Sequence, residues 1–164
     1  MTADGNGPQG ATSSASNTLN PSTLVIGNEG NATGIVTLQW SGIQDLDFTD
    51  GGALGIYVAF LNPIDHNLTI IFDVVDDLVT STVARTFPNL SQGGGFFPFL
   101  SFSDPSVFTS VNSVKAVFSS TAANWDAGID FIETTDVPVP GVLALMALMA
   151  LGLTGLRVTR RRPV

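Results

Sequence analysis

Hydrophobic and polar residues alternate along much of the chain between residues 22 and 136. In the segment 67–75, for example, Leu68, Ile70 and Phe72 fall on one side of an extended chain, and polar residues fall on the other. A period of two residues is typical of a β-strand with one buried face. This pattern, together with short apolar runs, predicts eight strands near residues 22–26, 33–40, 53–61, 67–75, 80–87, 96–102, 112–119 and 128–134.

Turn-forming residues gather between these segments. Glycine, proline, asparagine and aspartate, which favour turns, cluster at residues 27–30, 50–52, 62–63, 93–95 and 104–105. No segment before residue 137 has a sustained helical period. Many short strands separated by turns predict an all-β domain over residues 22–136, an antiparallel β-sandwich of jelly-roll type. The strand at 53–61 is apolar on both faces, so we expect it to be central and covered on both sides.

A second kind of pattern starts near the C-terminus. From Gly141 to Leu156, sixteen residues carry no charge. A helix of that length is about 24 Å long, and Arg157 can extend its reach toward the roughly 30 Å of a hydrocarbon core. Leucine, alanine and methionine favour helix, and the run is apolar on every face. The sequence therefore predicts one C-terminal transmembrane α-helix.

The charge of the chain divides at the same point. Residues 1–136 contain all fourteen acidic residues and only two bases, Arg85 and Lys115, which gives −12. Residues 137–164 contain no acid and four arginines, which gives +4. Positive residues beside a membrane span favour the cytoplasm, so we expect the acidic body outside. The cytoplasmic cluster is Arg157, Arg160, Arg161 and Arg162.

The C-terminal module resembles a known bacterial sorting signal. Its short proline box consists of Val137, Pro138, Val139 and Pro140, and is followed by the apolar run and the arginine cluster. This order resembles the PEP-CTERM signal, although Val139 stands where that family most often has glutamate. The resemblance implies that an exosortase, a membrane cysteine protease, recognises and processes the protein. An ordinary membrane anchor is the alternative interpretation.

The resemblance also implies a location. Before processing, the protein would lie in the bacterial inner membrane as a single-pass protein with its C-terminus in the cytoplasm. Afterwards it would reach the cell surface or the extracellular matrix. Residues 1–21, however, are rich in glycine, serine, asparagine and threonine and lack the regions of an export signal. We expect them to be loop or disordered, and we expect the natural start with its signal peptide to be missing.

The sequence offers little catalytic chemistry. It has no cysteine, and its single histidine, His66, falls in a predicted turn. It contains no nucleophile elbow, phosphate loop or dinucleotide-binding motif. The acidic residues Asp73, Asp76 and Asp77 follow the pattern of a solvated turn. We therefore expect no enzyme and no catalytic residues. The strongly acidic body also excludes nucleic-acid binding, which needs a basic surface.

One acidic loop is a candidate calcium site. Asp45, Asp47 and Asp50 precede two glycines, and carboxylate oxygens suit Ca²⁺. The spacing does not follow the EF-hand, because Thr49 and Ile56 occupy its fifth and twelfth positions. A different calcium loop and a solvated acidic turn both fit this pattern. No other cofactor is predicted.

Aromatic residues raise the possibility of sugar binding, because the apolar faces of sugars stack on exposed rings. We expect Trp40, Tyr57 and most of the phenylalanines of residues 96–102 to fill the core. Trp125 lies in a polar loop and is the predicted surface ligand residue. The leading hypothesis is a non-enzymatic surface or matrix protein. The alternative is a lectin-like carbohydrate-binding module that holds extracellular polysaccharide.

Overall fold

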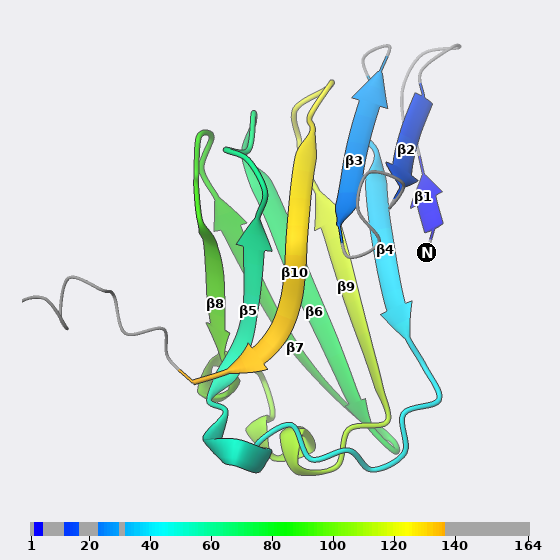
Figure 1. Cartoon of the computed structure of the whole chain (residues 1–164). Helices are drawn as coiled ribbons and strands as arrows, with labels where there is room; N and C mark the ends of the chain where they lie inside the picture. Colours follow the sequence, from blue (N-terminus) through cyan, green and yellow to red (C-terminus); the bar gives the residue numbers. More distant parts are fainter. Residues whose placement is uncertain (1, 5–11, 17–22, 30–31, 137–164) are drawn as a thin grey trace, which may run out of the picture.

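The protein folds into two antiparallel five-stranded sheets that pack face to face (Figure 1). The computed structural model describes residues 2–4, 12–16, 23–29 and 32–136. Sheet A has the strand order β1-β4-β9-β6-β7, and sheet B has the order β2-β3-β10-β5-β8. This arrangement confirms the predicted all-β antiparallel sandwich. The strands are β1 (Thr2–Asp4), β2 (Thr12–Ser16), β3 (Leu24–Glu29), β4 (Ile35–Trp40), β5 (Gly55–Phe60), β6 (Leu68–Asp76), β7 (Val79–Phe87), β8 (Gly94–Pro98), β9 (Ser113–Ser119) and β10 (Ala127–Thr135).

All eight predicted strands are present, and only one boundary differs by more than three residues. The strand predicted at 96–102 ends at Pro98 and continues as a 3-10 helix, η2 (Phe99–Ser101). The tighter turn directs Phe99 into the core, where its ring stacks on Phe108 with centroids 3.9 Å apart. Two further 3-10 helices are η1 (Asp50–Gly52) and η3 (Pro105–Thr109).

The N-terminal segment differs from the prediction of a loop over residues 1–21. Two parts of it are strands: β1 pairs with β4, and β2 pairs with β3. Thr2 lies opposite Thr37, and Thr12 lies opposite Glu29. The loop prediction is wrong for these two strands, because an outer strand is held by backbone hydrogen bonds and needs no apolar alternation.

The core lies between the inner faces of the two sheets. Along β6, every second residue from Leu68 to Val74 is buried in the core, and the residues between them, such as Thr69 and Asp73, face outward. Aromatic rings fill the centre: Phe72 meets Phe97 edge-to-face across the sandwich at 5.0 Å between ring centroids. The largest fully buried side chains are Trp125, Phe72, Phe97, Phe108 and Phe118.

The C-terminal predictions fall beyond Asp136 and therefore outside the described residues. They include the proline box from Val137 to Pro140, the apolar run from Gly141 to Leu156, and the cluster Arg157, Arg160, Arg161 and Arg162. Among residues that the structure does describe, no helix is long and apolar enough to cross a membrane.

Candidate functional site

Three aromatic residues, Tyr57, Phe96 and Phe131, form a patch on the outer face of sheet B. The register places Tyr57 of β5 directly between Glu133 of β10 and Phe96 of β8. Phe131 is 40% exposed, and its ring centroid lies 6.0 Å from that of Tyr57 at an interplanar angle of 47°. Tyr57 and Phe96 are partly exposed, so the expectation that Tyr57 fills the core is wrong. Strand β5 is interior, as predicted, but side chains cover this face of it rather than another layer of structure.

Two glycines allow these rings to lie along the sheet. A Cβ atom built on Gly94 would stand 2.9 Å from the Tyr57 hydroxyl oxygen, and one on Gly55 would stand 2.5 Å from Cζ of Phe96. The Phe96 ring therefore lies over Gly55, and the Tyr57 hydroxyl lies beside Gly94. The Tyr57 hydroxyl donates to the carbonyl of Gly93 at 2.7 Å and holds its ring in place. We call Tyr57, Phe96 and Phe131 the aromatic patch.

A cleft of about 350 Å³ lies beside the aromatic patch, on the far side of β10. It exists because β3 pairs with β10 only from Ala127 to Ile129, whereas β5 pairs with β10 as far as Thr135. Beyond Ile129, no described strand of sheet B lies beside β10 on the side away from β5. The floor of the cleft includes Phe72 and Val114, and Ile132 forms part of one wall.

Trp40 lines this cleft, and its exposure differs from the prediction. The sequence places Trp40 on the apolar face of its strand, and the register agrees, because Trp40 lies opposite Val114. The expectation of a buried core ring is nevertheless wrong, since the residue is 42% exposed. No described strand of sheet B covers Trp40. Its side chain lies on the inner face of sheet A and therefore lines the open cleft.

The loop before β5 places two carboxylates, Asp47 and Asp50, at the cleft. The Thr49 hydroxyl and backbone N–H donate to Asp47 at 2.6 Å and 2.8 Å and hold its pKa below the ordinary value. Asp45 instead accepts from Ser110 and Asn112 at 3.3 Å and 3.2 Å.

The calcium hypothesis for Asp45, Asp47 and Asp50 stays a prediction from the sequence. Within the described ranges, no group of three or more histidine, cysteine, aspartate or glutamate side chains is placed to hold a metal ion. Asp45 and Asp47 instead accept hydrogen bonds from neighbouring side chains. Adding EDTA and following the melting temperature tests the hypothesis: an unchanged temperature removes it, and a fall supports it.

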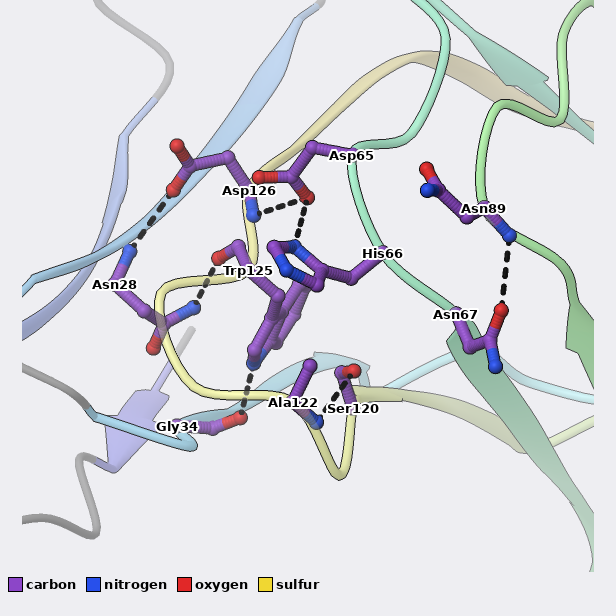
Figure 2. A network of polar contacts seen from close by, with 10 residues as sticks. All are labelled: Asn28, Gly34, Asp65, His66, Asn67, Asn89, Ser120, Ala122, Trp125 and Asp126. Atoms are coloured by element: carbon purple, nitrogen blue, oxygen red, sulfur yellow. Dashed lines mark hydrogen bonds and ion pairs between the residues drawn. The ribbon is translucent and has the colours of Figure 1, made fainter.

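Trp125 is not the surface residue that the sequence predicts. It is 1% exposed, and its indole N–H donates to the carbonyl of Gly34 at 3.1 Å. Figure 2 shows it within a polar network in which the Asn28 amide donates to the Trp125 carbonyl at 2.7 Å. The polar residues near Trp125 in the sequence take part in this network. The expectation of an exposed Trp125 ring is therefore wrong.

The same network ties two loops to the end of β3 at one end of the sandwich. Asp65 accepts from the backbone of Asp126 at 2.8 Å, and Asp126 accepts from the backbone of Asn28 at 3.1 Å (Figure 2). His66 lies in the predicted turn, with Nδ1 3.2 Å from the Asp65 carboxylate. A hollow of about 430 Å³ beside these residues opens on the outer face of sheet B, past Val25 and Gly128.

The acidic residues considered for catalysis have structural partners or lie at a turn. Asp73 accepts from Lys115 at 2.6 Å and from Thr82 at 2.8 Å on the outer face of sheet A. Asp76 ends β6, and Asp77 forms the turn that follows with a φ of +47°. None of the three lines the cleft or the hollow on sheet B.

The fold is similar to that of carbohydrate-binding modules. A solution structure of the module CtCBM11 matches with a TM-score of 0.50 and 15% identity, covering 84% of this chain and 90% of that one. A family 11 carbohydrate-binding module from Clostridium thermocellum, solved with a β-1,3-1,4-mixed-linked tetrasaccharide, matches with a TM-score of 0.44 and 11% identity, covering 82% and 88%. No protein-family model and no curated protein matches the sequence.

Proposed function

We propose that the sandwich is a non-catalytic module that binds a polysaccharide on the outer face of sheet B. The observation that carries this proposal is the aromatic patch, in which three partly exposed rings lie together on one outer face. A soluble domain has no structural need for three such rings on one solvent face. The likeness in fold to a carbohydrate-binding module supports the same conclusion.

The patch suits the two-sided chemistry of a sugar chain. The C–H faces of sugar rings are apolar and stack on aromatic faces, whereas their hydroxyls need hydrogen-bond acceptors. Glu133 supplies an exposed carboxylate directly beside Tyr57. Because the Tyr57 hydroxyl is bonded to Gly93, its ring is already oriented and loses little freedom when a ligand binds.

Calorimetric titration of the full chain with soluble polysaccharides, including mixed-linked β-glucan, tests the proposal. A polyoxyethylene detergent, which carries no sugar, keeps the chain in solution without competing. We expect Phe131→Ala to weaken binding about tenfold, because one lost ring contact removes roughly 1 to 1.5 kcal/mol. Leu78→Ala is the matched control, since Leu78 is 99% exposed and lies at the end of sheet A.

Two results would contradict polysaccharide binding at the patch. One is the absence of heat with every polysaccharide tested. The other is equal affinity of the wild-type chain and the Phe131→Ala variant for a polysaccharide that does bind. Retained binding in Leu78→Ala together with lost binding in Phe131→Ala supports the proposal.

We also propose that residues 137–164 sort the protein to the cell surface. The order of proline box, apolar run and arginine cluster supports this, as does the change from −12 to +4 at residue 137. Intact-mass measurement in cells with and without an exosortase tests it. We expect the mature form to lack Arg160, Arg161 and Arg162, and a mature protein that retains them would contradict processing.

A further inference from the structure

The cleft beside β10 has an apolar interior and an acidic margin. Its lining includes the exposed ring of Trp40 and the apolar side chains of Ile43, Phe48 and Ile132. Asp47, Asp50 and Glu133 also line it, and among the residues that the structure describes no lysine, arginine or histidine does. An open apolar cavity bordered by three carboxylates complements a ligand that has an apolar face and a positive charge.

The two basic residues in the described part of the chain, Lys115 and Arg85, lie away from the cleft. Lys115 pairs with Asp73 on the outer face of sheet A. Arg85 donates to the carbonyl of Phe96 at 2.9 Å, at the opposite edge of the sandwich from Trp40. Both are therefore held away from the cleft, which makes an anionic sugar such as a uronate a poor occupant.

The three carboxylates do not converge on one point. No group of three or more acidic or histidine side chains in the described parts of the chain is placed to hold a metal ion. Asp47, Asp50 and Glu133 line one cavity but do not surround a single point. This arrangement suits an organic cation better than a bare metal ion. The exposed indole of Trp40 favours the same ligand, because tryptophan is the strongest cation–π partner.

The cleft and the aromatic patch are neighbours on one face. Only β10 separates them: Phe131 belongs to the patch, Ile132 lines the cleft, and Glu133 borders both. A sugar chain that lies on Tyr57 and Phe131 can therefore reach across β10 and place a unit beside Trp40.

We propose that the cleft is a subsite for an amino sugar, a sugar unit with a free ammonium group, whose ring lies against Trp40. The ammonium group pairs with the carboxylates of Asp47 and Glu133. This inference rests on the proposed polysaccharide-binding function and adds its chemical class: a glycan that contains unacetylated amino sugars.

A pair of oligosaccharides that differ only in charge tests the subsite. The full chain is titrated with a glucosamine hexamer and, separately, with its fully N-acetylated counterpart, at a mildly acidic pH. We expect the charged hexamer to bind about tenfold more tightly, as hydrogen bonds to charged groups allow. The double variant Asp47→Asn Glu133→Gln should reduce this preference to about twofold.

Trp40 provides a readout that is specific to the cleft. The chain has only two tryptophans, and Trp125 is buried, so Trp40 dominates quenching of fluorescence by acrylamide. The charged hexamer should protect Trp40 from acrylamide. Asp104→Asn is the matched charge control, because Asp104 caps η3 beside β7, at the other edge of sheet A, and asparagine caps equally well.

The outcomes separate this inference from the function on which it rests. Equal affinity for the two hexamers, or binding of the charged hexamer without protection of Trp40, overturns the amino-sugar subsite and leaves polysaccharide binding standing. An equal loss of preference in Asp104→Asn overturns it too, because general attraction then explains the effect. If neither hexamer and none of the polysaccharides binds, both proposals are overturned.

Discussion

The outer faces of the two sheets carry different kinds of side chain. On sheet A, outward side chains satisfy one another: Lys115 and Thr82 both bind Asp73, and the hydroxyls of Thr69 and Thr86 lie 2.9 Å apart. On sheet B, the corresponding positions hold the rings of Tyr57, Phe96 and Phe131. Sheet A pairs its outward polar side chains with one another, whereas sheet B carries a cluster of partly exposed aromatic rings.

This difference is the reason that we place the proposed binding face on sheet B. Cross-strand polar pairs stabilise a sheet by a few tenths of a kcal/mol to about 1 kcal/mol and make an outer face soluble. Apolar rings on a solvent face gain their full contact area only when another molecule covers them. We therefore expect substitutions on sheet B to change binding and those on sheet A to change only stability.

The largest effect should come from the glycine beneath Tyr57. Gly94→Ala forces a Cβ to within 2.1 Å of the Val58 carbonyl at a φ of +133°. Strain and overpacking together should lower the free energy of unfolding by about 3 kcal/mol. Gly42→Ala is the control: its φ is +77°, but nothing lies within 4 Å of the added Cβ. We expect the control to lose about 1 kcal/mol in urea unfolding, and equal losses would contradict the close approach of the Val58 carbonyl to Gly94.

A smaller effect should follow from removing one hydroxyl. Tyr57→Phe keeps the ring and removes the hydrogen bond to the carbonyl of Gly93. We expect a loss of about 1 kcal/mol in the free energy of unfolding and a fall in polysaccharide affinity of no more than about threefold, because the stacking face remains. Calorimetry and urea unfolding on the same samples check this. Complete loss of binding would mean that the hydroxyl, not the ring face, contacts the ligand.

The ion pair of sheet A should have the smallest effect. A double-mutant cycle with Asp73→Asn and Lys115→Met should give a coupling of about 1 kcal/mol or less, with polysaccharide affinity unchanged in every variant. Lost binding in these variants would move the binding face to sheet A and contradict the comparison.

The pH dependence of that pair has a definite sign. Burial raises the pKa of Asp73, but hydrogen bonds from Lys115 and Thr82 and the charge of Lys115 outweigh it, so the pKa lies below its ordinary value of 3.8. A lowered pKa in the folded state stabilises the protein above the unfolded pKa. The stability difference between the wild-type chain and Asp73→Asn should therefore be constant above about pH 5 and shrink as the pH falls below about 3. A difference that grows on acidification would contradict the pairing.

The sequence predicts the strands well because alternation is a local signal. Leu68, Ile70 and Phe72 identify β6 without any knowledge of its neighbours. Strands β1 and β2 are missed because Thr, Ser and Ala carry no such alternation. The turn at Phe99 is missed because its direction depends on packing against Phe108.

The candidate site depends on contacts that a local pattern does not contain. Trp40 is exposed and Trp125 is buried, which is the reverse of the prediction. Trp40 is exposed because β3 separates from β10, and Trp125 is held inside by its hydrogen bond to Gly34. The aromatic patch combines residues 35 or more positions apart, and their register is set by long-range pairing. The apolar sequence of β5 predicts that both faces of this strand are covered. It does not predict that aromatic rings of the neighbouring strands cover one of those faces.

The central claim is that the outer face of sheet B binds a polysaccharide. Its most direct test is an NMR titration of the ¹⁵N-labelled full chain with an oligosaccharide that binds in calorimetry, chosen from a panel of neutral and amino-sugar chains. We predict saturable amide shifts that map to β5, β8 and β10 around Tyr57, Phe96 and Phe131. Shifts confined to β6, β7 and β9 of sheet A, or no shifts with this or any other oligosaccharide, would contradict it.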